Sequence, residues 1–223
     1  MLPWHTIDTV LFDMDGTLLD LHFDDIFWRQ IVPQSYAKQQ GISPEQAFAV
    51  MSKKMAEATS ALDWYSFAYW NQTLGLDLLS MKQSITHKIA YRPNAEALLQ
   101  ALHHSEKQVI LATNADQTGL KLKLEHIPFD QYFDALYSAH DLGAAKEDQA
   151  FWHALQAAHP FDPARTLFVD DNLKVLNSAR TYGIQHLLAI AQPNLSRAPV
   201  ATGEFTAVVD FAHLLPIASN NNP

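Results

Sequence analysis

Short apolar runs that each end in polar residues recur along the chain, and they constrain its fold more than any other feature. Runs of this length bounded by turn residues indicate buried β-strands. The runs that we expect to form strands are Thr9–Phe12, Gln108–Ala112, Ala135–Ser138, Thr166–Val169 and His186–Ile190. Helical patterns lie between them at 93–104, 116–126, 147–158 and 173–182. This alternation predicts parallel βαβ units and an α/β fold, a three-layer sandwich around a parallel sheet.

The segment from residue 21 to residue 91 interrupts this alternation because it contains no strand pattern. Ser43-Pro44-Glu45-Gln46 and the segment 80–83 have the pattern of a helix capping box, and large apolar residues recur at helical spacing through 62–76. We expect an inserted, all-helical cap at 21–91 and an α/β core formed by 1–20 and 92–223. Ligands bind beyond the carboxyl ends of parallel strands, so a cap inserted there would cover the site.

Composition excludes several classes of function. The chain has 24 acidic and 15 basic residues, a formal net charge of −9, which argues against nucleic acid as a partner because phosphate backbones require clustered cations. An anionic substrate would need local positive charge, such as a divalent metal ion. There are no cysteines, which excludes disulfides and thiolate chemistry. We see no apolar run long enough for a membrane span and no signal-peptide pattern, and we expect a cytoplasmic protein.

Carboxylates follow two of the expected strands, and the carboxyl ends of parallel strands meet at one edge of a sheet. Asp13 and Asp15 follow the first, and Asp170 and Asp171 follow the fourth. Acids gathered there repel one another unless a hard cation joins them, and Mg²⁺ is the usual oxygen-bound choice. With a metal present, one carboxylate of the first pair can attack a phosphoryl group while the other transfers protons.

The sequence resembles the haloacid dehalogenase (HAD) superfamily over about residues 7–190. Asp13-Met14-Asp15-Gly16-Thr17 is similar to its first motif, DxDGT, and the run ending at Thr113-Asn114 is similar to its second. Lys146 matches the lone lysine of the third motif, and Phe168-Val169-Asp170-Asp171 matches the acidic pair of the fourth. All four motifs occur in order, so the resemblance implies a HAD-like Rossmannoid core.

The resemblance also implies catalytic roles. Asp13 would be the nucleophile, and Asp15 would be the general acid and base. Thr113, Asn114 and Lys146 would hold the substrate phosphate, and Lys146 would also stabilise the charge of the nucleophile.

The same resemblance implies a Mg²⁺ site. Asp13, the main-chain carbonyl of Asp15 and Asp171 would be ligands, and Asp170 would assist. Many members place a further aspartate where this chain has Val175. The adjacent pair of Asp170 and Asp171 is the alternative arrangement, so we expect metal binding to be retained.

Three segments are similar to the bacterial GMP/IMP nucleotidase branch of the superfamily; they are 13–21, 64–77 and 146–154. This likeness implies a small phosphorylated substrate, most specifically a purine nucleoside 5′-monophosphate, and Mg²⁺-dependent hydrolysis through an aspartyl-phosphate. A sugar-phosphate phosphatase or a phosphoglucomutase-like transferase is the main alternative. A 2-haloacid dehalogenase is disfavoured by Asp15, and a silent binding protein is disfavoured by the intact acidic and lysine motifs. The oligomeric state is not predicted.

The aromatic run from Trp64 to Trp70 allows two interpretations. Its rings can pack the helices of the cap against one another, or they can stack on the base of a nucleotide. Asp24, shortly after the first motif, can line the mouth of the site or belong to a loop. The sequence leaves both questions open.

Overall fold

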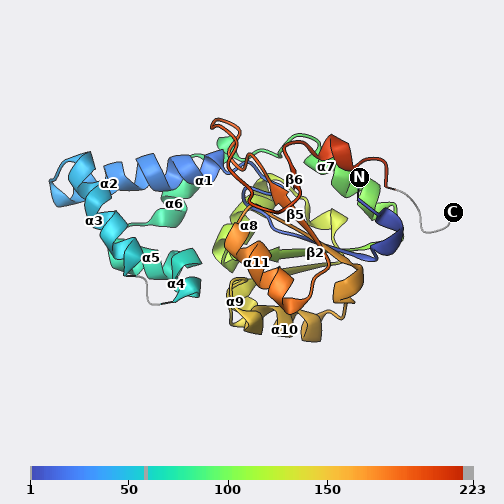
Figure 1. Ribbon diagram of the computed structural model, residues 1–223. Helices are drawn as coiled ribbons and strands as arrows, with labels where there is room; N and C mark the ends of the chain where they lie inside the picture. The colour runs from blue at the N-terminus through green and yellow to red at the C-terminus, as the bar shows by residue number, and fades with distance from the viewer. Residues whose placement is uncertain (1, 58–59, 218–223) are drawn as a thin grey trace.

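The computed structural model describes residues 2–57 and 60–217, and its central feature is a parallel sheet (Figure 1). Six strands are arranged in the order β3-β2-β1-β4-β5-β6, and each is paired in parallel with its neighbours. Their bounds are β1 Thr9–Phe12, β2 Gln108–Thr113, β3 Ala135–Ser138, β4 Thr166–Asp170, β5 His186–Ile190 and β6 Ala207–Val208. The order places β1 and β4, which carry the acidic motifs, side by side, with β2 on the other side of β1.

Helices account for most of the remaining structure. Before β2 the chain forms α1 His22–Ile26, a π-helical turn at Phe27–Ile31, α2 Val32–Gln40, α3 Pro44–Ala56, α4 Ala61–Tyr65, α5 Phe67–Leu74, α6 Leu78–Gln83 and α7 Ala95–His103. After β2 it forms α8 Gln117–His126, α9 Ala139–Leu142, α10 Gln149–Ala158 and α11 Leu173–Tyr182. Short 3₁₀ turns occur at Trp4–Thr6, Thr86–Lys88, Asp130–Tyr132, Pro163–Arg165 and Phe211–Leu214.

Helices cover both faces of the sheet because alternate residues of each strand point to opposite sides. Val10 and Phe12 of β1 belong to a buried cluster that includes leucines of α7 and α8. Leu11, between them, belongs to a second cluster formed with α10 and α11, in which Trp152 is fully buried. Two apolar clusters on opposite faces of one sheet confirm the predicted three-layer α/β sandwich.

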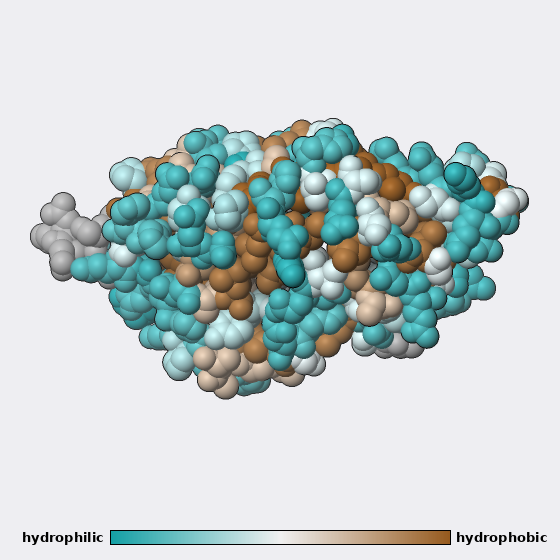
Figure 2. All heavy atoms as spheres, turned by 180° about the vertical axis from the view of Figure 1, so that it is seen from behind, coloured by the Kyte–Doolittle hydropathy of each residue, from teal (hydrophilic) through white to brown (hydrophobic). Residues whose placement is uncertain are grey.

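The helices α1 to α6 form a lobe beside the sheet, on the left in Figure 1, and no strand occurs among the described residues of 21–91. From behind, apolar side chains gather near the centre of the surface and over parts of this lobe (Figure 2). The arrangement supports our proposal of a helical cap at 21–91 and a core of 1–20 and 92–223. No described helix is both long enough and apolar enough to cross a membrane.

The structure corrects the expected helix ends in two places. The capping box at Ser43 is present, since Ser43 and Gln46 each accept a hydrogen bond from the main chain of the other. Ser80 caps nothing, because α6 begins two residues earlier, where the Asp77 carboxylate accepts a hydrogen bond from the Ser80 N–H. Helix α7 begins after Asn94, which has a φ of 58°, so Pro93 precedes the helix instead of opening it. The two-residue strand β6 is too short for its sequence to show a strand pattern.

Candidate active site

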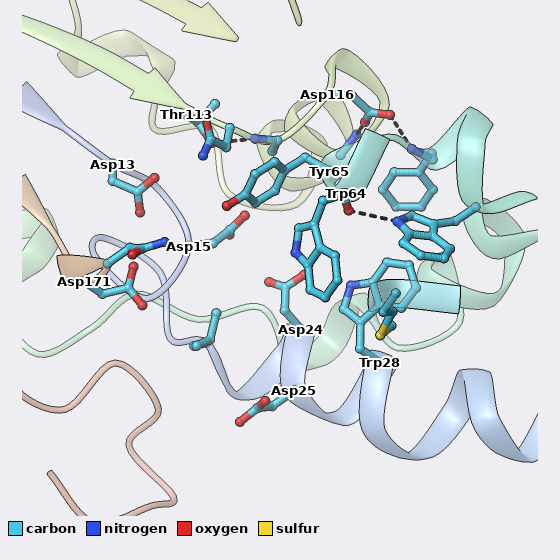
Figure 3. Close-up of a pocket in the computed structure, with 18 of the residues that line it drawn as sticks. Asp13, Asp15, Asp24, Asp25, Trp28, Trp64, Tyr65, Thr113, Asp116 and Asp171 are labelled. Carbon is cyan, nitrogen blue, oxygen red and sulfur yellow. Dashed lines mark hydrogen bonds between the residues drawn. The ribbon is translucent and has the colours of Figure 1, made fainter. Parts of the chain in front are cut away.

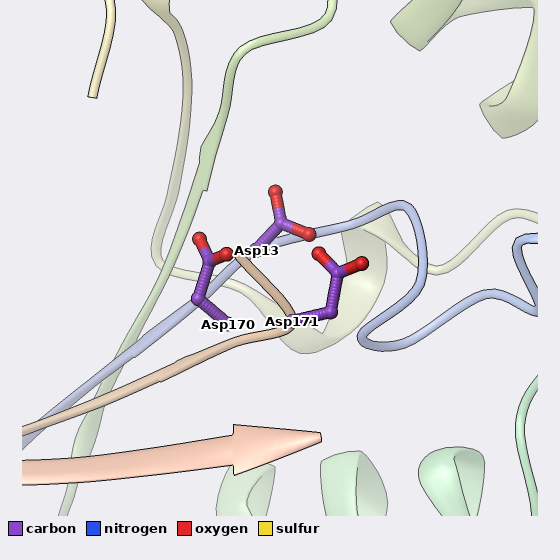
Figure 4. Close-up of side chains that lie close together, drawn as sticks. All are labelled: Asp13, Asp170 and Asp171. Atoms are coloured by element: carbon purple, nitrogen blue, oxygen red, sulfur yellow. The ribbon is translucent and has the colours of Figure 1, made fainter. Parts of the chain in front are cut away.

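Three carboxylates meet at the carboxyl edge of the sheet. Asp13 follows β1, Asp170 ends β4, and Asp171 follows it; each offers one oxygen, and these oxygens lie within 4.8 Å of one another (Figure 4). They come together because β1 and β4 pair in register from Thr9 with Thr166 to Phe12 with Val169. Residues distant in the sequence thus form one oxygen-rich cluster.

Lys146 lies against this cluster. Its Nζ is 2.5 Å from Asp13 Oδ1 and 2.7 Å from Asp170 Oδ2, and the side chain is almost fully buried. Burial alone would lower the pKa of Lys146, but the two carboxylates raise it above its usual range. Lys146 is therefore a fixed positive charge beside the expected nucleophile.

The pKa values of Asp170 and Asp171, at the end of β4, are both raised. Burial raises the pKa of Asp170 to about 7, although the neighbouring Lys146 acts in the opposite direction. Burial, together with repulsion from Asp170 and Asp13, raises the pKa of Asp171 well above its ordinary value. One lysine, Lys146, does not balance the charge of these three clustered acids, and a bound cation would relieve the excess negative charge.

Gly16 brings the first motif close to Asp171. The loop is closed by the Gly16 N–H, which donates to the Leu19 carbonyl at 2.8 Å. The φ of Gly16 is +86°, and a Cβ added there would lie 2.5 Å from Asp171 Oδ2. The motif needs glycine here both for its backbone conformation and for the space that the carboxylate occupies.

Asp15 belongs to a second buried network, which sequence reasoning missed. Lys123 of α8 makes ion pairs with Asp15 and, at 3.0 Å, with Asp24 of α1. Lys82 of α6 lies 2.5 Å from the other oxygen of Asp24. The network thus joins the first motif to two helices of the expected cap. Asp15 and Asp24 were named from the sequence, but neither lysine was. The only signal for Lys123 was its place among leucines on α8.

The network sets the protonation of its carboxylates. Burial raises the pKa of Asp15 to about 6, even though Lys123 opposes the shift. Burial would also raise the pKa of Asp24, but Lys123 and Lys82 overcome it and hold the value at about 2. Asp24 is therefore a constant negative charge, whereas Asp15 can gain and lose a proton close to neutral pH.

Thr113 and Asn114 lie at the end of β2, beside the acidic cluster, as expected. The Thr113 hydroxyl accepts a hydrogen bond from the Ala115 N–H at 3.1 Å. The Asn114 side chain accepts from the Lys146 N–H and donates to Glu147, each at 2.9 Å. The Asn114 amide thus holds the loop that carries Lys146, a positioning contact that the sequence did not indicate.

Two hydrogen bonds join the short helices α4 and α5 to this edge of the sheet. The hydroxyl of Tyr65 donates to Glu147 at 2.9 Å, and the Phe67 N–H donates to Asp116 at 2.6 Å. Tyr65, Phe67 and Asp116 are among the residues that line a cavity of about 700 Å³. This cavity is lined both by the acidic residues of the sheet edge and by aromatic residues of the helical lobe (Figure 3).

The residues of the aromatic run differ in exposure, although Trp64, Phe67 and Trp70 all line the cavity. Trp70 and Phe67 are buried, with 2% and 7% of their surface exposed. Trp64, in contrast, is 44% exposed. The run therefore does not have a single role.

A divalent metal ion fits the acidic cluster by the chemistry of its donors. Asp13, Asp170 and Asp171 offer only carboxylate oxygens, which suit Mg²⁺ and give no preference to soft metals. Val175, where many members have a further aspartate, is a buried residue of α11. The main-chain carbonyl of Asp15, two residues after Asp13, would be an additional oxygen ligand.

Comparisons with known proteins agree with this geometry. The family model of haloacid dehalogenase-like hydrolases matches residues 10–189. The chain therefore belongs to the haloacid dehalogenase-like hydrolases and is an enzyme of the hydrolase class. It is 38% identical over 215 residues to the GMP/IMP nucleotidase YrfG of Escherichia coli (strain K12), covering 96% of this chain and 97% of that protein. The GMP/IMP nucleotidase YrfG of Shigella flexneri matches to the same extent.

Solved structures show the same fold at low sequence identity. A HAD phosphatase from Thermococcus onnurineus superposes with a TM-score of 0.76 at 19% identity, covering 93% of this chain and 96% of that one. An L-2-haloacid dehalogenase from Xanthobacter autotrophicus superposes with a TM-score of 0.62, also at 19% identity, with coverage of 93% and 96%. Since both reaction types occur on this fold, the fold alone does not choose between them.

Proposed function

We propose that the protein is a Mg²⁺-dependent phosphomonoesterase that acts on purine nucleoside 5′-monophosphates such as GMP and IMP. The observation that carries the proposal is the cluster of Asp13, Asp170 and Asp171 with Lys146 beside it. The likeness to GMP/IMP nucleotidases over 96% of the chain supports the substrate class. No nucleic-acid or membrane partner is part of the proposal.

In the first step, an oxygen of Asp13 attacks phosphorus and the bond from phosphorus to the 5′ oxygen breaks. Asp15 donates a proton to that oxygen, which leaves as the nucleoside hydroxyl. Thr113, Asn114 and Lys146 would hold the phosphate. In the second step, Asp15 takes a proton from water, the water oxygen attacks phosphorus, and the bond to Asp13 breaks to release phosphate.

Mg²⁺, held by Asp13, Asp171 and the Asp15 carbonyl with Asp170 assisting, would offset negative charge on the phosphate. Lys146 offsets the charge of Asp13 at the same time.

The position of Asp15 favours ester hydrolysis over dehalogenation. An alkoxide leaving group needs a proton, whereas a halide does not. Because its pKa is raised to about 6, Asp15 is suited to provide that proton near neutral pH. A sugar-phosphate substrate would use the same chemistry. Only the measured substrate preference distinguishes a sugar-phosphate phosphatase from a nucleotidase.

The test is phosphate release from GMP, IMP, ribose 5-phosphate and glucose 6-phosphate with Mg²⁺, for the native protein and for Asp13→Asn. We expect the nucleotides to be preferred, and Asp13→Asn to lose activity by at least ~10³-fold with unchanged melting. Asp130→Asn, on the surface, is the control for a lost carboxylate. Substantial activity of Asp13→Asn would refute the nucleophile, and preference for a sugar phosphate would refute the substrate class.

A further inference from the structure

The end of the cavity opposite the acidic cluster is apolar and lies in the helical lobe. Trp28, Met51, Met55 and Trp64 line it (Figure 3). Phe48 also lines it and, like Trp64, is an exposed large apolar side chain, at 45% against 44%. Exposed aromatic surface inside a cavity is a cost to the free protein, and it indicates an apolar occupant.

The Trp64 ring is held in place although much of it is exposed. Its ring centroid is 6.2 Å from that of the buried Trp70, at an interplanar angle of 84°. The Trp70 indole N–H donates to the Trp64 carbonyl at 2.8 Å. The Trp70 ring also contacts Trp28, with centroids 6.1 Å apart. Trp70 therefore supports two tryptophans that line the cavity, and the exposed ring is ordered before any ligand arrives.

The chemistry of the two ends fixes what can span them. One end offers Lys146 and the carboxylates that fit a cation, which suits a phosphate. The other offers flat apolar rings, which sugar hydroxyls cannot use and a nucleobase can. A cavity of about 700 Å³ is within the range of sites for molecules of this size.

We propose that this aromatic end is the nucleobase subsite and that Trp64 is the residue on which the base stacks. The inference rests on the proposed function, because it assigns the part of the substrate that distinguishes a nucleotide from a sugar phosphate. Stacking uses the face of a base and not its hydrogen-bonding edge. Trp64 accordingly increases activity on nucleotides as a class and does not separate GMP from AMP.

The experiment compares kcat/KM for GMP, AMP and ribose 5-phosphate, which has the same phosphate and sugar but no base. Trp64→Ala lowers kcat/KM for both nucleotides by about tenfold or more. Its activity on ribose 5-phosphate changes by less than about twofold. Trp64→Phe, which restores an aromatic face, retains most of the nucleotide activity. The Trp70 hydrogen bond survives these substitutions because it uses the main-chain carbonyl of residue 64.

Val50→Ala is the matched control, since Val50 is an exposed apolar residue on α3 that does not line the cavity. It leaves all three activities unchanged. Equal losses for Trp64→Ala on all three substrates would overturn the inference and assign the ring to packing. If the native protein prefers ribose 5-phosphate to both nucleotides, the proposed function fails, whatever the variants do.

Discussion

Replacing Gly16 with alanine tests whether catalysis depends on the position of Asp171. A Cβ at this residue would lie 2.5 Å from Asp171 Oδ2 and 2.8 Å from Asp171 Cγ. To reach an ordinary contact of 3.4 Å, the oxygen has to move by about 0.9 Å. Because the clashing atoms belong to the end of the Asp171 side chain, we expect the carboxylate to move out of its place in the cluster.

Two effects of different size follow. The φ of +86° costs an alanine about 1–2 kcal/mol of folding free energy, which lowers the melting temperature by about 2–8 °C in a chain of this length. The displaced carboxylate costs far more in rate, because a shift of about 1 Å in an active site can lower kcat ~100-fold. We also expect Gly16→Ala to need more Mg²⁺ for half-maximal activity, since Asp171 is a proposed ligand.

Gly41→Ala separates strain from displacement. Gly41 ends α2 with a φ of +66°, and a Cβ there would meet nothing within 4 Å. It therefore carries a similar backbone cost without moving a carboxylate. The assays are steady-state hydrolysis of GMP over a Mg²⁺ titration and thermal unfolding of both variants. If Gly16→Ala matches Gly41→Ala in kcat and in Mg²⁺ requirement, Asp171 has no role that depends on its position.

Two further predictions concern the buried charges. Because the pKa values of Asp170 and Asp15 are raised to about 7 and about 6, the folded metal-free protein binds more protons than the unfolded chain between about pH 4 and pH 7. Its stability falls as pH rises through that range, so Mg²⁺ should raise the melting temperature more at pH 8 than at pH 5. An equal rise would exclude the Asp170 carboxylate from the metal site. Excess EDTA should abolish hydrolysis. Lys123→Met should lower the free energy of unfolding in urea by about 3–5 kcal/mol, because it removes the shared partner of Asp15 and Asp24. Lys121→Met, on the exposed side of the same helix, should lower it by less than about 0.5 kcal/mol. Equal losses would refute the network.

The strand ends were predictable because their signal is local. A buried parallel strand needs a continuous apolar run, and the polar residues that follow it must lie at the sheet edge. Asp13 and Asp170 could therefore be placed at one edge without knowledge of the strand order. Pairing of β1 with β4 then brings them to within reach of one Lys146.

The second network was not predictable because it depends on how the lobe lies over the core. Lys123 follows Leu122 on α8, and both are buried. A buried lysine has the same sequence pattern as a solvated one until its acidic partners are known. Those partners are Asp15, more than a hundred positions earlier, and Asp24, on a helix whose position no local pattern fixes.

The division of the aromatic run has the same cause. Trp64 and Trp70 are six residues apart, and both fit the apolar face of a short helix. The helix breaks between α4 and α5 at Ser66, which caps α5, and of the two rings that line the cavity Trp70 is buried whereas Trp64 is 44% exposed. The sequence signal for such a break is weak, and tertiary contacts decide which ring becomes buried.

Charge balance around the cavity explains how an acidic chain can accept an anionic substrate. Asp15 and Asp24 are balanced by Lys82 and Lys123, so that network is neutral when both acids are ionised. The remaining cluster has three carboxylates against Lys146 alone, a formal charge of −2. A phosphate would be repelled by that cluster, and a divalent cation is the smallest addition that brings it to neutrality. Although the chain carries −9 overall, a Mg²⁺ ion bound at this cluster would remove the local negative charge that a phosphate meets.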